Sequence, residues 1–248
     1  MKLTLFLVAS VLITFPCVSQ SDSKFYFDIG VKGGYGLNLL INQNILNDKN
    51  VDSEFSFGPS FGGRIGGNFN EKRSVNLEVL YSGFNQQYSV KSDSLHWNKT
   101  ISFSTLDLAL LYRNFVNGSY MEIGPEVSLV QSAVESNSVS GSANAGKLLT
   151  PNYFSGIFGF GANFLGNDNI SIMAGVRASY SFTDIISDLG GKSQDRSFPL
   201  NEPFYKNATA SYASTNPLTV RLMLEISFDL GYFTRSKCNK KRLKFLSF

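Results

Sequence analysis

Apolar and polar residues alternate along most of this 248-residue chain, and the alternation limits the folds open to it. From Phe25 to Asn38 the odd positions are mostly large and apolar, whereas the even positions are mostly polar or small. A period of two places the two sets on opposite faces of a β-strand. The pattern recurs, so we predict eight antiparallel strands, at residues 25–38, 55–69, 75–82, 101–113, 120–129, 154–164, 170–182 and 218–230.

The fourth of these strands contains a change of parity. Leu106, Leu108 and Leu110 share one face, but Ile101 and Phe103 fall on the other. A β-bulge inserts one residue and shifts the alternation by one position. We therefore expect a bulge near Ser104 or Thr105.

The segments between the strands alternate in length. Long polar segments cover residues 40–54, 89–99, 134–151 and 186–215, whereas short turns occur near residues 70–73, 116–119 and 166–169. After the first 19 residues no apolar run approaches the ~18 residues of a spanning helix. A chain that crosses a membrane without helices must close its sheet, because open edges leave backbone groups unpaired in lipid.

Together these features predict an all-β fold, an eight-stranded antiparallel up-and-down transmembrane β-barrel in the bacterial outer membrane. Such barrels have short periplasmic turns and long extracellular loops. A soluble β-sandwich would also show alternating strands. It does not predict strands that mostly have ~11 or more residues, since soluble strands usually have ~5 to 6.

The two ends of the chain read differently from the middle. Lys2, the apolar stretch Leu3–Phe15 and the small residues before Gln20 are typical of a signal peptide over residues 1–19. A lipoprotein acylated at Cys17 is the alternative. We expect the barrel to cover residues 20–233, followed by a basic periplasmic tail at 234–248. This tail could bind anionic lipid or a partner, and the alternative is a solvated extension.

Aromatic residues make up 14% of the sequence, and many fall at the predicted periplasmic ends of strands. Outer-membrane barrels carry aromatic girdles at both membrane interfaces. We expect one girdle to contain Phe25, Phe69, Tyr112, Phe164, Tyr232 and Phe233, and we place Tyr120 with it.

The face opposite the apolar one carries charges of both signs. An eight-stranded barrel is only wide enough for side chains to fill its interior. We expect a paired polar network there, with a narrow ion pathway or gate as the alternative. Its predicted members are Lys32, Arg64, Glu78, Arg113, Glu122, Glu126, Arg177, Arg221 and Glu225, with Asp28 and Asp107 on the same face.

Four segments resemble the PorT-like outer-membrane β-barrel family of Gram-negative bacteria. They are Gly30–Gly34, Leu77–Ser82, Leu106–Tyr112 and Tyr120–Pro125. The resemblance implies a small, porin-like barrel, and one branch of the family is associated with a protein secretion and gliding system. This chain departs from the pattern after Phe233, because such barrels usually end on an aromatic residue at the last strand.

Nothing in the sequence predicts catalysis or a cofactor. General-base chemistry usually recruits histidine, but His96 is the one histidine and lies in a predicted loop beside Trp97. A metal site needs several ligands, and the sequence offers one histidine and no paired ligands. A net charge of +3 concentrated in the tail gives no reason to expect nucleic acid. We expect a non-enzymatic monomer in outer-membrane lipid, with a structural or surface-interaction role through its loops and a surface or periplasmic protein partner. The alternatives are an accessory component of a secretion system and a small-solute porin.

Overall fold

The computed structural model describes residues 25–70, 72–92, 95–138, 141–166, 170–192, 213–234 and 242–245. The elements, in chain order, are β1 (Phe25–Ile41), α2 (Gln43–Leu46), β2 (Val51–Glu54), β3 (Ser56–Asn70), β4 (Arg73–Ser92), β5 (Leu95–Val116), β6 (Ser119–Asn137), β7 (Gly141–Asn144), β8 (Asn152–Gly166), β9 (Ile170–Ser181), the π-helical turn η1 (Asp188–Lys192), β10 (Asn216–Thr234) and β11 (Arg242–Phe245). No helix in these ranges is long and apolar enough to cross a membrane.

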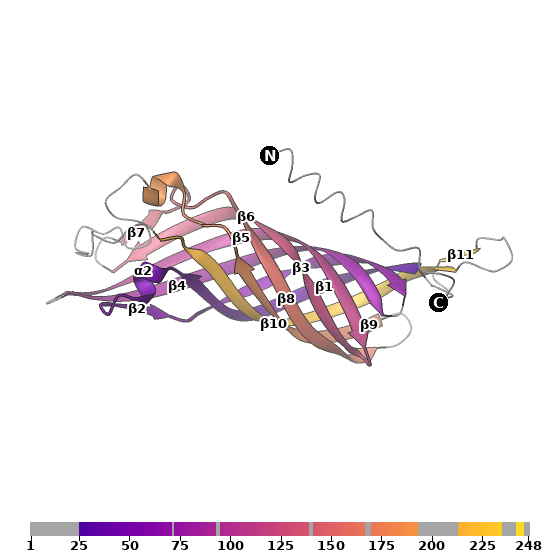
Figure 1. Ribbon diagram of the computed structural model, residues 1–248. Helices are drawn as coiled ribbons and strands as arrows, with labels where there is room; N and C mark the ends of the chain where they lie inside the picture. The colour runs from indigo at the N-terminus through magenta and orange to yellow at the C-terminus, as the bar shows by residue number, and fades with distance from the viewer. Residues whose placement is uncertain are drawn as a thin grey trace.

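Eight of the described strands close into a ring. Their order is β1-β3-β4-β5-β6-β8-β9-β10, all neighbours are antiparallel, and β10 pairs back with β1 from Phe25↔Phe233 to Ile41↔Asn216. Figure 1 shows the strands tilted around a common axis. The prediction of an eight-stranded antiparallel up-and-down barrel is confirmed.

The two ends of the barrel differ. At one end, here called the turn end, tight connections join β3 to β4, β5 to β6 and β8 to β9. Asn117 and Gly118 both have positive φ there, at 51° and 80°, as the Asn-Gly turn requires. The other end, the loop end, carries α2, β2, β7 and η1 (Figure 1).

The alternation of the sequence becomes an apolar outside and a polar inside. Outward side chains such as Ile65, Leu77 and Leu222 are exposed, whereas inward ones such as Glu78 and Arg113 are buried. This is the reverse of a water-soluble barrel. The outer surface therefore suits lipid over the length of this apolar band.

Residues 89–99 are not the long loop that the sequence predicts. β4 runs to Ser92 and β5 starts at Leu95, and the two pair without a break from Arg73↔Asn114 to Ser92↔Leu95. Polar residues alternate with Tyr88, Val90 and Trp97 here, so the segment keeps the period of a strand while its overall composition resembles a loop.

The parity change on β5 has a different cause from the one expected. A register irregularity does fall between Ser104 and Thr105, in the pairing with β6, but the additional residue is Gln131 on β6. Along β5 the alternation is unbroken. Ile101 and Phe103 are therefore inward and buried, while Leu106 and Leu108 face outward.

Above the apolar band, the barrel sheet continues as a five-stranded extension, which we call the loop-end sheet. β2 pairs with β4, and β7 pairs with β6, so the order is β2-β4-β5-β6-β7. Its inner face is covered by α2 and by the connections around residues 145–151 and 183–190. The long strands thus build a folded body at the loop end.

Several sequence expectations fall outside the described residues. They are the signal peptide at 1–19, the start of the mature chain at Gln20, residues 193–212 of the predicted last loop, and most of the tail at 234–248. Within the tail, Arg242–Phe245 form β11, which pairs antiparallel with Gly231–Thr234 of β10.

Candidate functional site

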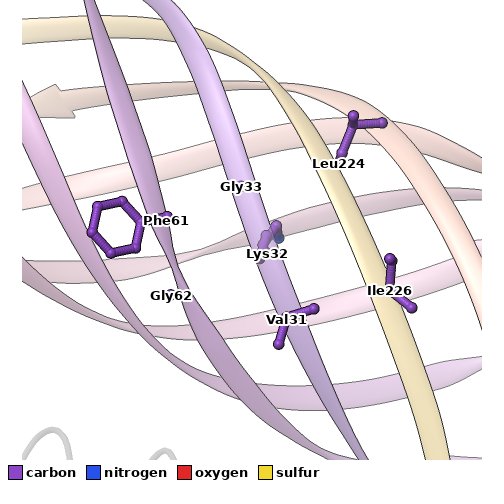
Figure 2. A pocket seen from close by; sticks show the side chains of 7 residues that line it. All are labelled: Val31, Lys32, Gly33, Phe61, Gly62, Leu224 and Ile226. Carbon is purple, nitrogen blue, oxygen red and sulfur yellow. The ribbon is translucent and has the colours of Figure 1, made fainter.

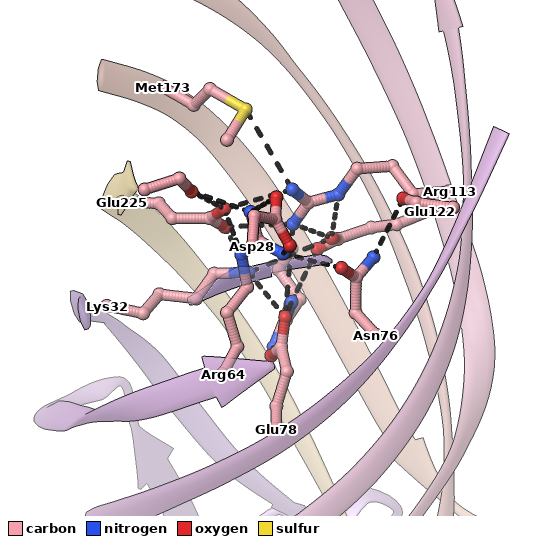
Figure 3. Close-up of polar contacts among 12 residues, drawn as sticks. Asp28, Lys32, Arg64, Asn76, Glu78, Arg113, Glu122, Met173 and Glu225 are labelled. Carbon is pink, nitrogen blue, oxygen red and sulfur yellow. Dashed lines mark hydrogen bonds and ion pairs between the residues drawn. The ribbon is translucent and has the colours of Figure 1, made fainter. Parts of the chain in front are cut away.

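Seven of the nine charged side chains predicted to line the interior meet in one network (Figure 3). The network lies in the half of the barrel nearer the turn end, because Glu78, Arg113 and Glu122 are close to the turn-end limits of β4, β5 and β6. Seven strands supply the seven side chains, one each, and each side chain points inward because of the strand alternation. The members are Lys32, Arg64, Glu78, Arg113, Glu122, Arg177 and Glu225, joined by Asp28, and we call this set the lumen network.

Glu225 on β10 contacts three cations. Arg113 donates from Nη1 and Nη2 to its two oxygens at 3.0 and 2.8 Å, and Lys32 Nζ lies 3.2 Å from Oε2. Arg64 also donates to Glu225 through Nε. On its other side Arg64 binds both oxygens of Asp28, at 3.0 and 2.8 Å.

Glu78 and Glu122 are the hydrogen-bond acceptors on the opposite side of the network. Arg177 donates to Glu78 at 2.7 and 3.2 Å and to Glu122 at 2.8 and 2.6 Å. Lys32 Nζ donates to Glu78 at 2.9 Å. Charge-assisted bonds of this length are the strong class of protein hydrogen bonds.

Tyr120 belongs to the interior and not to the girdle. It is buried, and the guanidinium of Arg113 lies 4.4 Å from the centre of its ring. The placement in the girdle was wrong because Tyr120 has the inward parity of Glu122. A cation over an aromatic ring contributes favourable energy where water is excluded.

The lumen network crosses the barrel from wall to wall. In the ring order, β4 lies opposite β9, and β5 lies opposite β10. The Glu78–Arg177 and Arg113–Glu225 bonds join these opposite strands directly. All four side chains are buried, so side chains occupy the centre of the barrel at this level.

Charge is balanced within the network. It contains four cations, Lys32 and three arginines, and four carboxylates, Asp28 and three glutamates. Burying a charge is costly unless it is paired and hydrogen-bonded. Every charge here meets that condition through at least one opposite partner.

Glu126 and Arg221 do not join the network. They lie farther toward the loop end, where Ser179 donates to Glu126 at 2.7 Å and Arg221 Nη1 lies 4.0 Å from Asp107. Arg221 also donates to Ser82 on β4 at 3.2 Å. Sequence alternation placed both residues inside but could not show at which height along the axis each one lies.

An apolar core, which the sequence reading missed, lies inside the loop end. Phe84 and Phe103 stack with ring centres 4.5 Å apart, and Tyr88, Trp97 and Ile101 are buried with them. The complete cluster is Leu40, Ile45, Val51, Phe84, Tyr88, Val90, Trp97, Ile101, Phe103, Ala133, Ala145, Leu149, Tyr153, Ile185 and Ile186. The signal was present as apolar residues of inward parity on β4 and β5. Trp97, expected in a loop, lies in this core.

Hydrogen bonds hold the covering segments over this core. Thr150 donates from its backbone N–H to the Ile185 carbonyl at 2.8 Å, and Ile185 donates to the Thr215 carbonyl at 3.0 Å. Asn42 donates to Thr215 Oγ1 at 2.8 Å. Three connections that are distant in sequence are thus joined above the barrel interior.

The girdle residues that can be placed lie at the turn end. Phe25 and Phe69 have ring centres 5.6 Å apart, and Phe69, Tyr112 and Phe164 are exposed on the outer surface. Tyr232 and Phe233 pair with Tyr26 and Phe25 through the backbone. Their side chains lie outside the described part of the structure.

A hollow of about 430 Å³ opens on the outer surface of β1, β3 and β10. Figure 2 shows Val31, Phe61, Leu224 and Ile226 around it, with Gly33 and Gly62 at positions where no side chain fills the space. The hollow lies within the apolar band. Lys32 also lines it, but the Nζ of Lys32 pairs with Glu78 in the barrel interior.

The described residues contain no group of three or more His, Cys, Asp and Glu that could hold a metal ion. His96 is on β5, exposed on the outer face of the loop-end sheet, and not in a loop as expected. Its neighbours Asp93 and Ser94 lie outside the described residues.

A family model described as "Outer membrane protein beta-barrel domain" matches residues 5–202 of the chain. Among solved structures, the chain is similar to neisserial surface protein A, at 12% identity and a TM-score of 0.40, over 82% of this chain and 96% of that one. It is also similar to OprG from Pseudomonas aeruginosa, at 12% identity and a TM-score of 0.33, over 85% and 97% of the two chains. A third similar structure is the outer membrane protease OmpT from Escherichia coli, at 8% identity and a TM-score of 0.38, over 86% and 99%. No curated protein matches the sequence.

Proposed function

Because this chain belongs to the outer membrane protein beta-barrel domain family and lies in the bacterial outer membrane, we propose that it is a closed, non-enzymatic barrel that presents the loop-end sheet at the cell surface. The turn end then faces the periplasm, as short turns do in this class of protein. The barrel anchors the sheet, and the sheet provides the surface for interaction.

The observation that carries this proposal is the double closure of the interior. The lumen network joins opposite walls near the turn end, and the apolar core fills the loop end. An ion on its way through would have to break buried charge pairs and then pass an apolar layer, and an unpaired charge is costly in both places. A pore of this architecture has no conducting path in the folded state.

Single-channel recording in planar bilayers tests the closure. We expect the full-length protein to insert without unit conductance steps. A variant that weakens only the lower layer, Arg177→Met, should also stay closed, because the apolar core is untouched. Regular steps from the unaltered protein would overturn the proposal and favour the small-solute porin.

The surface role is supported by how the loop end is built. β4, β5 and β6 have 20, 22 and 19 residues, and their loop-end portions lie beyond the apolar band. Ordering that much chain costs conformational entropy, which the apolar core offsets. A barrel with only an anchoring role needs no such body.

The narrower resemblance to the PorT-like branch stays a prediction, as does the accessory role in secretion. So do the monomeric state and the periplasmic partner. A pull-down with the full chain and with a chain that ends at Phe233 tests the partner. Retention of the same periplasmic protein by both chains would mean that the tail is not needed for binding the partner.

A further inference from the structure

The outer face of the loop-end sheet has an unusual composition. On β4, β5 and β6 its twelve outward positions between residues 85 and 136 include one charged side chain, Lys91. Water-facing surfaces usually carry roughly 25–35% charged residues. The twelve are Asn85, Gln87, Ser89, Lys91, His96, Asn98, Thr100, Ser102, Ser104, Ser132, Val134 and Ser136.

These side chains form an ordered array. One row crosses all five strands, because Glu54 pairs with Gln87, Gln87 with Thr100, Thr100 with Ser136 and Ser136 with Ser142. Neighbouring strands are ~4.8 Å apart, and outward residues along one strand are ~6.6 Å apart. The result is a regular grid of hydroxyl and amide groups.

The position of the array indicates what it contacts. The alternation on β4 and β5 is unbroken, so Asn85 and Ser102 face the same direction as Tyr81 and Leu106 in the apolar band. The array therefore points sideways, into the layer directly outside the acyl chains. In a bacterial outer membrane that layer is the saccharide of the outer-leaflet glycolipids, continuous with the acyl chains that the apolar band is suited to face.

The charge of the array favours the sugars over their phosphates. Its charged groups, with β2 included, are Asp52, Glu54 and Lys91, and Lys91 donates to Asp52 at 2.9 Å. That leaves Glu54, an anion that repels phosphate. Ser, Thr, Asn and Gln side chains both donate and accept hydrogen bonds, as sugar hydroxyls do.

We propose that the outer face of the loop-end sheet binds the uncharged saccharide of outer-leaflet glycolipids, and this proposal depends on the proposed function for the placement of the sheet outside the cell. The array acts sideways, in the plane of the membrane surface. A second binding surface at the top of the barrel is not needed for this contact.

The test uses the full chain refolded in phosphatidylcholine vesicles that contain no glycolipid. The probe is the oligosaccharide released from lipopolysaccharide by mild acid and then dephosphorylated. Binding is followed by saturation transfer from the protein to the sugar protons, with the phosphorylated oligosaccharide in parallel.

The variant Gln87→Ala/Asn98→Ala removes two outward-facing amides, one half-buried and one exposed, from adjacent strands of the array. At a typical net contribution for each hydrogen bond, affinity should fall roughly tenfold. The matched control Gln43→Ala/Asn47→Ala removes the same two residue types from α2 and its end, outside the array, and should bind as the parent does. Trp97 fluorescence verifies that each variant is folded.

Unchanged binding by the Gln87/Asn98 variant would overturn the inference, and so would binding of the phosphorylated oligosaccharide alone. Absence of any saccharide binding by a non-conducting parent protein would overturn the inference and leave the proposed function in place. Channel steps in the parent would instead remove the proposed function, whatever the saccharide result.

Discussion

Replacing Glu225 by Gln should destabilise the barrel more than any exposed charge change. Glu225 is buried and holds three cations, Lys32, Arg64 and Arg113. The substitution keeps the shape of the side chain but leaves four cations facing three carboxylates. Removing one partner of a buried ionic group typically costs about 3–5 kcal/mol.

The remaining contacts decide where in that range the cost lies. Arg113 keeps Glu122 at 2.8 Å, Arg64 keeps Asp28, and Lys32 keeps Glu78 at 2.9 Å. No cation is left without a carboxylate, so we expect the lower part, near ~3 kcal/mol. The double variant Glu225→Gln/Lys32→Met restores three cations against three carboxylates and should recover at least half of the loss.

Urea unfolding in phospholipid vesicles, followed by Trp97 fluorescence in both directions, measures these free energies. Asp52→Asn is the matched control, because it removes a carboxylate from an exposed pair with Lys91 and should leave stability unchanged within error. A loss of less than ~1 kcal/mol for Glu225→Gln would refute the coupling of the network. So would a double variant no more stable than the single one.

Three further predictions follow from close contacts and burial. Gly124→Ala should prevent barrel assembly, because the new Cβ would lie 2.0 Å from the Leu110 carbonyl oxygen. The measurement is the loss of the fast-migrating folded band on unboiled gels. The control Gly33→Ala should fold, since the nearest atom to its new Cβ lies 3.9 Å away. Trp97 emission should resist quenching by both acrylamide and brominated lipid, since Trp97 is buried in the apolar core, and efficient quenching by either would contradict that placement. A nitroxide attached at Tyr81→Cys should be accessible to oxygen dissolved in lipid, whereas a nitroxide attached at Gln87→Cys should be accessible to a water-soluble nickel complex. Equal accessibility at the two sites would refute the assigned edge of the apolar band.

The strand alternation was enough to predict the eight strands of the ring and the charged residues that face inward. Lys32 and Glu78 could be placed inside because each follows a period of two from a clear apolar neighbour. Their partners could not be predicted, because pairing depends on the shear of the barrel and on which strands lie opposite. The separation of Glu126 from the lumen network could not be predicted either, because the height of a residue along the barrel axis depends on how the ring closes.

The loop-end sheet was missed for a different reason. A segment such as residues 96–104 has Ser, Thr and Asn on one side and Trp97, Ile101 and Phe103 on the other, so its mean composition resembles a loop. Composition averages over the two faces, whereas the fold depends on each face separately. A loop and a strand of this composition differ only in whether the apolar residues fall at alternate positions.

That parity locates the membrane surface. On β4 the outward residues are apolar to Tyr81 and polar from Asn85, while the inward ones change from Glu78 to Phe84. Because β4 pairs with β5 without a break here, the chain itself is not shifted, and only the surroundings change from lipid to water. A bulge would shift every later side chain to the other face. An unbroken strand whose apolar residues change parity is therefore a strand that leaves a membrane, and Ile101 and Phe103 mark that exit on β5 where we had expected a distortion.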